Sequence, residues 1–353
     1  MTNAKRAPDA RLAENVPDHI CIVMLTGLGD VVHGLPVANA LKRAWPHARI
    51  SWVTEPMPAG ILNPHPAIDQ VIVYRKKDGV AGVIDLWRRM RGERFDLTLN
   101  LHPYFKSIFG TLFSRAPIRW TLGPDRARDG VWLAGNRRLP ARPRQHTQDT
   151  FLEFLHVLGV EPDPIEWKLV ITDEERAAQR RFLHDLAGRP AVAVVTASAN
   201  AKKDWPAERY VPVIDAIEAD LGARAVLIGG PGEREQAAVR LITARAQHAP
   251  IDLTGSPVRS MIWQLDACNA VVAPDTGPLH LARAVGTRTV GLFGHTNPWR
   301  VGPYRTDEDL WIDEYTDGQP DPSNFTPKLG RMERIKPHHV IEKLELALRR
   351  SRT

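Results

Sequence analysis

The chain carries one pattern twice: short apolar segments alternate with longer helix-like segments, first between residues 20 and 158 and again from residue 191 onward. Unbroken apolar runs such as residues 191–195 are typical of parallel strands that helices cover on both faces. The pattern predicts an α/β protein with two Rossmann-like domains, whose parallel sheets face each other across a cleft. The expected strands are residues 20–25, 50–54, 70–74 and 95–100 in the first half, and 191–195, 225–228, 251–254, 270–273 and 289–293 in the second.

The length of 353 residues suits two domains of ordinary size. Residues 1–17 are polar and lack the hydrophobic core of a signal peptide, so we expect a flexible leader on a cytoplasmic protein. The remaining boundaries follow from polar and Pro-rich stretches between residues 140 and 188. We expect an N-terminal domain at 18–170, a linker helix at 171–188, a C-terminal domain at 189–335, and a C-terminal helix at 336–353 with the option of packing back on the N-terminal domain.

Composition excludes several classes of protein. No apolar run reaches the roughly 18 residues that a membrane-spanning helix needs. The two cysteines, Cys21 and Cys268, stand in apolar or helical surroundings, which predicts buried free thiols. No cluster of His and Cys has the spacing of metal ligands, so we expect no metal site.

Positive charge is concentrated in one stretch of the chain. Between Arg75 and Arg144 there are 16 basic and 6 acidic residues, whereas the whole chain carries a net charge of only +6. Such a stretch suits a phosphorylated substrate, an anionic membrane surface or a nucleic acid, and equally a solvated face with no partner. The chain shows no nucleic-acid-binding motif and no interleaving of aromatic and basic residues, so nucleic acid is not expected as a partner.

A glycine turn follows the first expected strand and reads Gly27-Leu28-Gly29-Asp30-Val31-Val32-His33. It lacks the third glycine of the dinucleotide fingerprint and the Gly-Lys-Ser/Thr of a P-loop. The turn leads to an expected helix that starts at Pro36. Asp30 and His33 are side chains of the kind that serve as general bases, and Gly29 allows close approach of a ligand. The alternative is that Asp30 only caps the helix.

A second motif, Asp275-Thr276-Gly277-Pro278-Leu279-His280, lies between the expected strand 270–273 and a helix. In open α/β sheets, ligands bind at such strand ends, and helix N-termini favour anions because their first N–H groups lack internal partners. The alternative is a simple N-cap at Asp275 or Thr276, with Pro278 in the first turn.

Three more loops of the second half follow strands. Ser198 and Lys203 belong to a polar, basic loop that could hold phosphate oxygens, or to an ordinary surface loop. Glu233 follows the glycine-rich residues 229–232 and could bind ribose hydroxyls or cap the next helix. Thr296 lies in a polar loop after the last strand. Four strands of one domain thus end in candidate ligand loops.

Four motifs together resemble glycosyltransferase family 9, the heptosyltransferases that build the inner core of bacterial lipopolysaccharide. They are G-D-x-x-H-x-x-P at residues 29–36, K-x-W-P at 203–206, D-T-G-P-x-H at 275–280 and L-F-G-x-T-x-P-x-R-x-G-P at 292–303. The resemblance implies a GT-B fold, in which the N-terminal domain binds the acceptor and the C-terminal domain binds the donor. It also implies inverting transfer, without metal or other cofactor, from ADP-L-glycero-D-manno-heptose.

The resemblance further implies a role for each matching residue. Asp30 corresponds to the general base, Lys203 to a lysine on the donor phosphates, Glu233 to an acid on the adenosine ribose, and Asp275 to an acid facing the donor sugar. The diphosphate-binding helix start comprises Thr276, Gly277, Pro278, Leu279 and His280. The implied partners are ADP-heptose, a phosphorylated lipid A–Kdo or heptosylated core acceptor, and the cytoplasmic face of the inner membrane, bound peripherally.

Two other functions remain open from the sequence. An enzyme of the same fold could use another nucleotide sugar or another acceptor. A non-catalytic module could bind a nucleotide sugar without turnover. Carboxylates such as Asp30 and Asp275 argue against this, because negative charges beside a diphosphate do not favour its binding.

Overall fold

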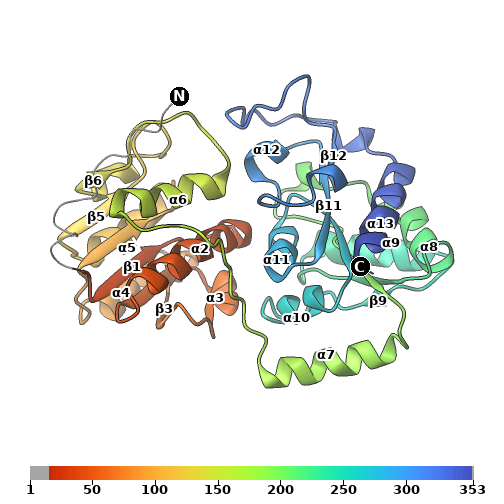
Figure 1. The fold of residues 1–353 in the computed structure, drawn as a ribbon, viewed down its shortest axis with the longest axis horizontal. Coiled ribbons are helices and arrows are strands. Elements are labelled where there is room, and N and C mark those ends of the chain that lie inside the picture. Colours follow the sequence, from red (N-terminus) through yellow and green to blue (C-terminus); the bar gives the residue numbers. More distant parts are fainter. Residues whose placement is uncertain (1–15, 352–353) are drawn as a thin grey trace. The chain divides into compact units, whose positions relative to one another are not determined.

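The structure is a computed structural model that describes residues 16–351, so residues 1–15 of the expected leader lie outside the described part of the chain. The chain divides into two compact units, residues 1–168 and 169–353. Each unit contains one sheet flanked by helices (Figure 1).

The first unit is built on a six-stranded sheet in the order β3-β2-β1-β4-β5-β6, and all its strand pairs are parallel. The strands are β1 (His19–Val23), β2 (Arg49–Thr54), β3 (Gln70–Val73), β4 (Leu97–Asn100), β5 (Ile118–Thr121) and β6 (Arg137–Arg138). β5 and β6 were not predicted, because each is short and carries arginine within it.

The helices of this unit are α2 (Leu28–Ala44), α3 (Pro56–Leu62), α4 (Gly79–Met90), α5 (Ile108–Phe113) and α6 (Thr147–Leu158), with short 3-10 turns η1 (Lys76–Asp78), η2 (Phe105–Ser107) and η3 (Val131–Ala134). α2 starts eight residues before the expected Pro36, which lies inside the helix. The expectation was wrong because Pro usually marks a first helical turn. Here Gly27, with a φ of 78°, is the N-cap residue, and the helix begins at Leu28. The apolar side chains of its first two turns, such as Val31 and Val32, are buried.

The second unit repeats the topology with the order β12-β11-β10-β7-β8-β9, and its strand pairs are again parallel. The strands are β7 (Ala191–Val194), β8 (Arg224–Leu227), β9 (Ile251–Asp252), β10 (Ala270–Pro274), β11 (Arg288–Phe293) and β12 (Ile312–Asp313). The helices are α7 (Asp173–Asp185), α8 (Tyr210–Ala219), α9 (Glu233–Arg245), α10 (Ser260–Asp266), α11 (Gly277–Val285), α12 (Pro298–Val301) and α13 (Pro337–Ser351), with 3-10 turns η4 (Ala201–Lys203), η5 (Ala207–Arg209), η6 (Glu308–Leu310) and η7 (Met332–Arg334).

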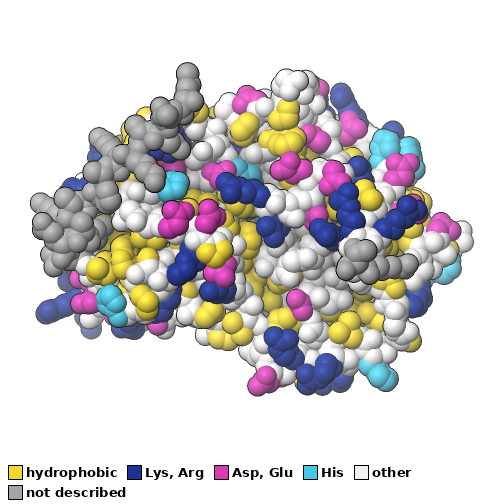
Figure 2. All heavy atoms as spheres, in the orientation of Figure 1, with side chains coloured by type: hydrophobic (Ala, Val, Ile, Leu, Met, Phe, Trp, Pro, Cys, Tyr) yellow, Lys and Arg dark blue, Asp and Glu magenta, His cyan; other side chains and the backbone are white. Residues whose placement is uncertain are grey.

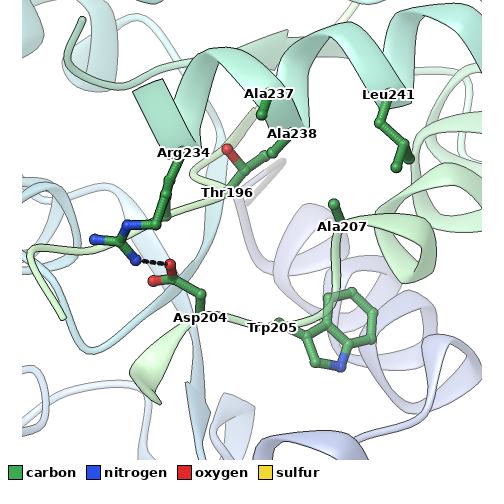
Figure 3. A pocket seen from close by; sticks show the side chains of 9 residues that line it. Thr196, Asp204, Trp205, Ala207, Arg234, Ala237, Ala238 and Leu241 are labelled. Atoms are coloured by element: carbon green, nitrogen blue, oxygen red, sulfur yellow. Dashed lines mark hydrogen bonds and ion pairs between the residues drawn. The ribbon is translucent and has the colours of Figure 1, made fainter. Parts of the chain in front are cut away.

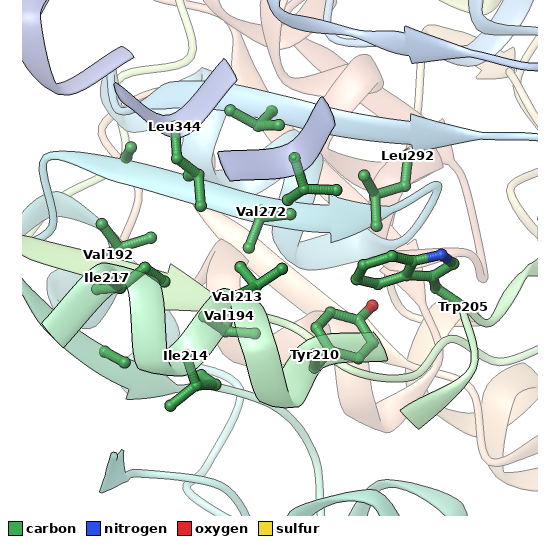
Figure 4. Close-up of a cluster of buried hydrophobic side chains, with 14 of the residues drawn as sticks. Val192, Val194, Trp205, Tyr210, Val213, Ile214, Ile217, Val272, Leu292 and Leu344 are labelled. Carbon is green, nitrogen blue, oxygen red and sulfur yellow. The ribbon is translucent and has the colours of Figure 1, made fainter. Parts of the chain in front are cut away.

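The C-terminal helix α13 belongs to the core of the second unit. It packs on α8, β10 and β11, and its buried stripe of Val340, Leu344, Ala347 and Leu348 joins the same cluster as Val272 and Leu292 (Figure 4). The contacts of α13 with α8, β10 and β11 lie within its own unit, and packing on the N-terminal domain stays a prediction.

The expected linker helix, α7, is also docked within the second unit. Gln179 donates through Nε2 to Asp266 Oδ2 at 2.7 Å, and the ring of Phe182 contacts that of Trp263 on α10 at 6.0 Å between centroids. A capping box fixes its start, because the Thr172 hydroxyl accepts from Glu175 N and the Glu175 carboxylate accepts from Thr172 N. The boundary between the two units along the chain falls between Lys168 and Leu169, just before α7.

Both cysteines are buried free thiols, as predicted, and burial raises the pKa of Cys268 to about 12. Within residues 16–351 there is no helix with both the length and the apolar character required to cross a bilayer. On the face drawn in Figure 2, Lys and Arg side chains lie between acidic and apolar ones in both units.

Candidate active site

Both sheets contain a point where the strand order reverses. In the second unit β7 leads through β8 to β9 on one side, and β10 leads through β11 to β12 on the other. The carboxyl ends of β7 and β10 therefore flank the position at which open α/β sheets bind ligands. Lys203 follows β7 and Asp275 follows β10.

Asp275 lies at the centre of a three-residue cluster at this edge of the sheet. Its Oδ2 accepts a hydrogen bond from Lys203 Nζ at 2.7 Å, and its Oδ1 lies 3.4 Å from His280 Nε2. The Asp275 and His280 side chains are buried, at 7% and 5% exposure, whereas Lys203 retains 27%. Lys203 is thus the most exposed member of the cluster.

The charge of Asp275 depends on these neighbours. Burial alone would raise the pKa of its carboxyl group, but the Lys203 ammonium and the hydrogen bond from His280 outweigh burial and hold the pKa well below its usual range. Asp275 is therefore an ionised carboxylate inside the protein, and it orients the ammonium group of Lys203.

The start of α11 lies directly beside Asp275. Thr276 is the N-cap residue in extended backbone, with Gly277 and Pro278 as the first helical residues. The Thr276 hydroxyl does not cap the helix, while its carbonyl accepts from Leu279 N at 3.1 Å. Pro278 has no N–H and that of Leu279 is used by Thr276, so Gly277 supplies the backbone N–H of this turn, and with the positive end of the helix dipole it creates a site that favours an anion.

Lys203 is held in place by the core beneath it. Trp205, two residues later, is 2% exposed and donates through Nε1 to the carbonyl of Ile335. Its ring meets that of Tyr210 edge-on at 4.8 Å, and the Tyr210 hydroxyl donates to Val195 O at 3.1 Å (Figure 4). The segment after η4 is consequently tied to the end of β7, which limits where Lys203 can lie.

Ser198 stabilises the loop before Lys203. Its hydroxyl donates to Asn200 O at 2.7 Å and lies 2.8 Å from Asp204 Oδ1, which also accepts from Ser198 N at 2.7 Å. Arg234 on α9 pairs with Asp204 and donates to Ser198 O at 2.7 Å. The sequence analysis missed Asp204 and Arg234, although Asp204 lies inside the K-x-W-P motif.

A cavity of about 270 Å³ lies beside this loop. Figure 3 shows the Asp204–Arg234 ion pair on one part of its wall, and the small side chains of α9 on another. The lining residues are Thr196, Ala197, Asp204, Trp205, Ala207, Arg234, Ala237, Ala238 and Leu241.

The glycine turn after β8 encloses a different acid from the expected one. Glu233 is the first residue of α9 and is exposed, whereas Glu235 folds back and accepts from Gly230 N through Oε1 at 3.0 Å. A Cβ at Gly229 would lie 2.5 Å from that oxygen, so a larger residue there would displace the Glu235 carboxylate. Burial raises the pKa of Glu235 above its ordinary value, even though the backbone N–H groups of Gly230 and Gly232 oppose the shift.

Thr296 is half-buried in the loop after β11. Its neighbours anchor a later segment of the chain: His295 and Lys328 bond reciprocally through His295 Nδ1 to Lys328 O at 2.9 Å and Lys328 N to His295 O at 3.1 Å. Asn297 Nδ2 donates to the carbonyls of Asp321 and Asn324. This loop thus supports the residue 321–328 segment.

The first unit has its own reversal point, between β1 and β4. Asp30 follows β1 in the first turn of α2, half-exposed, so it is inside the helix and is not its N-cap residue. A Cβ on Gly27 would lie 2.3 Å from Asp30 Oδ2. The carboxylate therefore folds over Gly27, and the positive φ of that glycine makes room for it. Gly29, between the two, is also half-exposed.

Two histidines lie near this strand edge. His33, one turn after Asp30, is buried and its Nδ1 lies 3.0 Å from Gln148 Oε1 on α6. His102, which the sequence analysis missed, follows β4 and is 1% exposed, with Nδ1 3.4 Å from Met24 Sδ. Burial, reinforced by Lys106 and Lys76, lowers the pKa of His102 to about 3, so this imidazole is neutral at ordinary pH.

The structure thus gathers Lys203, Asp275 and His280 at the start of α11, and puts Asp30 and His33 on one turn of α2. Across residues 16–351, no group of three or more His, Cys, Asp or Glu side chains is arranged to hold a metal ion.

Comparison with known proteins gives concordant matches. A family model described as glycosyltransferase family 9 (heptosyltransferase) matches residues 83–319. A curated relative, the lipopolysaccharide core heptosyltransferase OpsX of Haemophilus influenzae, is 30% identical over 294 residues, which cover 83% of this chain and 84% of the relative.

Solved structures agree with this fold. The crystal structure of a family 9 glycosyl transferase from Veillonella parvula has a TM-score of 0.80 at 24% identity and covers 94% of this chain and 98% of its own. The E. coli heptosyltransferase WaaC with ADP-2-deoxy-2-fluoro heptose has a TM-score of 0.68 at 20% identity and covers 93% and 99%. The two Rossmann-like units therefore have the GT-B fold that the sequence predicted.

Proposed function

The chain belongs to glycosyltransferase family 9, as its four motifs predicted, and on that basis we propose that it transfers a heptosyl group from ADP-L-glycero-D-manno-heptose to an inner-core lipopolysaccharide acceptor. The observation that carries this proposal is the Lys203–Asp275 pair at the N-terminus of α11. The name of the Haemophilus relative and the heptose analogue in the E. coli structure support the choice of sugar.

The leaving group dictates what the donor site must supply. When the bond between the sugar C1 and the diphosphate oxygen breaks, ADP departs with the electron pair and gains negative charge. An ammonium group has three N–H donors, and the contact with Asp275 uses one of them, so Lys203 retains donors for the diphosphate. The N–H of Gly277 and the positive end of the α11 dipole add further stabilisation, and in this scheme the reaction needs no metal ion.

Asp275 has two tasks in this proposal. As a buried carboxylate it holds Lys203 in position, and it faces the donor sugar, where a negative charge stabilises positive charge that develops at C1. Thr276, Gly277, Pro278, Leu279 and His280 complete the diphosphate site, and Ser198 and Thr296 border it. Two acids are candidates to bind the ribose hydroxyls: Glu233, and Glu235, which lies against the glycine turn.

Asp30 acts as the general base. The acceptor hydroxyl oxygen attacks C1, its proton passes to the Asp30 carboxylate, and the C1–oxygen bond to ADP breaks on the opposite side of the ring, which inverts the configuration. The chemistry requires one complex in which the acceptor hydroxyl reaches both Asp30 and C1. His33, one turn later on α2, positions this region through Gln148.

The proposed acceptor is a phosphorylated lipid A–Kdo or a heptosylated core. Such a molecule is anionic and lipid-anchored, which accords with the 16 basic against 6 acidic residues between Arg75 and Arg144. We propose that the protein works in the cytoplasm, peripherally attached to the inner membrane.

The test is a donor and acceptor panel. The purified protein is incubated with ADP-heptose, ADP-glucose, UDP-glucose or GDP-mannose, each with Kdo-containing and heptosylated core acceptors, in buffer with and without EDTA. Nucleotide release and product masses are measured. We expect one added heptose with ADP-heptose alone, unaffected by EDTA. Preferred transfer of another sugar would replace the heptose assignment, and nucleotide binding without release in every combination would favour a binding module.

A further inference from the structure

Helix α4 exposes an apolar stripe on the first unit. Val80, Ile84 and Trp87 follow the i, i+4, i+7 spacing of one helix face, and they are 75%, 43% and 44% exposed. The opposite face carries Gly82, Leu86 and Met90, which are buried. The stripe is therefore additional to the face that holds the helix on the sheet.

Basic side chains border this stripe. Arg91 lies over the Trp87 ring at 5.2 Å, Arg88 is exposed beside it, and Lys76 and Lys77 are exposed just before the helix. We call Val80, Ile84, Trp87, Lys76, Lys77, Arg88 and Arg91 the α4 surface. One exposed acid, Asp78, lies among its lysines, while Asp85 is paired with Arg89 at 2.8 Å on the flank of the helix. The α4 surface is thus apolar in the middle and predominantly cationic around it.

We propose that the α4 surface docks on an anionic phospholipid bilayer. Aliphatic side chains and a tryptophan in the middle of a basic rim match the requirements of an interfacial helix: apolar groups enter the acyl boundary and cations stay with the headgroups. A nucleic acid is a poorer partner, because binding to its phosphate backbone makes no use of exposed aliphatic side chains. A protein is also a poorer partner, because lysine is depleted in protein interfaces. The location also fits a lipid-anchored acceptor, and in that respect the inference rests on the proposed function.

Vesicle flotation tests the docking directly. The full chain is mixed with phosphatidylcholine vesicles that contain 30% phosphatidylglycerol, or with pure phosphatidylcholine vesicles. The apolar variant is Val80→Ser/Ile84→Ser/Trp87→Ser, and the charge variant is Arg88→Glu/Arg91→Glu. Matched controls come from α7, where Leu183 is 44% exposed and Arg180 and Arg181 are exposed: Leu183→Ser and Arg180→Glu/Arg181→Glu.

We expect the parent to bind anionic vesicles at least tenfold better than neutral ones, and both α4 variants to lose tenfold or more while both controls bind like the parent. Equal binding by the parent to neutral and anionic vesicles, or equal losses in the α7 controls, would overturn the proposal. Loss in the charge variant alone, with normal binding by the apolar variant, would also overturn it, because it would indicate a general polyanion surface.

A second readout separates this inference from the proposed function. Transfer to a Kdo-containing core oligosaccharide from which the lipid has been removed should be unchanged in the apolar variant, and unfolding temperatures should match the parent. Transfer to the same core embedded in vesicles should fall at least tenfold. Absence of transfer to the soluble core in the parent would count against the proposed function, whereas normal soluble transfer with no vesicle binding would overturn the α4 surface alone.

Discussion

Asp275 and Lys203 depend on each other. A carboxylate with 7% exposure remains ionised because an ammonium group lies 2.7 Å away and His280 adds a hydrogen bond, and that ammonium keeps its orientation through the same contact. The adjacent Lys202 is exposed on the same 3-10 turn and makes no ion pair with Asp275. Lys202 is therefore a matched control for substitutions of Lys203.

Replacing Lys203 with alanine should weaken ADP binding at least about tenfold, because the diphosphate loses its cation and the buried Asp275 charge then repels it. Lys202→Ala should bind ADP like the parent. Isothermal titration calorimetry with ADP gives both affinities. Equal affinities for Lys203→Ala and the parent would remove Lys203 from the phosphate site.

His102 should make the stability of the first unit depend on pH. Burial, with Lys106 and Lys76, lowers its pKa to about 3 from an unfolded value of 6.5. Between these values the unfolded chain binds a proton that the folded chain does not, so the free energy of unfolding falls as pH decreases. From pH 6.5 to 4.5 the loss from this residue is about 2 kcal/mol.

The check is His102→Gln, which cannot titrate. Urea unfolding between pH 4.5 and 7 should show a shallower fall in the unfolding free energy of the variant than of the parent. His184→Gln, at an 89% exposed side chain, should keep the parent's slope. Identical slopes for His102→Gln and the parent would mean that His102 is not held neutral.

At the scale of elements, the start of α2 decides where Asp30 lies. Gly27 begins the helix with a φ of 78°, and Asp30 fills the space a Cβ would need. Gly27→Ala should cost about 1–2 kcal/mol of stability through the backbone alone. By displacing the carboxylate it should also lower kcat at least about tenfold, with ADP affinity unchanged. Gly92→Ala, where a Cβ meets nothing within 4 Å, is the control. Normal kcat in Gly27→Ala would show that the position of Asp30 is not critical.

Most elements that carry the candidate site could be predicted from the sequence, because residues 20–25, 191–195, 225–228 and 270–273 are unbroken apolar runs. The short β5 and β6 could not be predicted, since their pairing depends on neighbours distant in the chain. The direction in which a side chain points could not be predicted from the sequence either. Glu235, two positions past Glu233 on the same helix, turns back into the glycine loop, and only the backbone course of that loop decides between them.

Pairings across elements explain the other omissions. Asp204 and Arg234 stand 30 positions apart, and nothing in either segment alone indicates that they share an ion pair. Similarly, the sequence predicted a C-terminal helix but left open which sheet it covers, and in the structure α13 packs on β10 and β11.

At the scale of the whole molecule, the two units have the same strand order and each has its candidate residues at the reversal point. Asp30 belongs to the first unit, whereas Lys203, Asp275 and His280 belong to the second. The proposed division of labour is that the first unit deprotonates the acceptor while the second binds the donor and stabilises the leaving group. Loss of the base should therefore affect turnover and leave nucleotide binding unchanged.

The most direct measurement of this claim is Asp30→Asn, assayed in parallel for ADP affinity by calorimetry and for heptosyl transfer from ADP-heptose. The account predicts that kcat falls at least about a hundredfold, the scale of a lost general base, while the Kd for ADP stays within twofold of the parent. Turnover close to that of the parent would contradict the assignment of Asp30, and so would a loss of activity that matches an equal loss of ADP affinity.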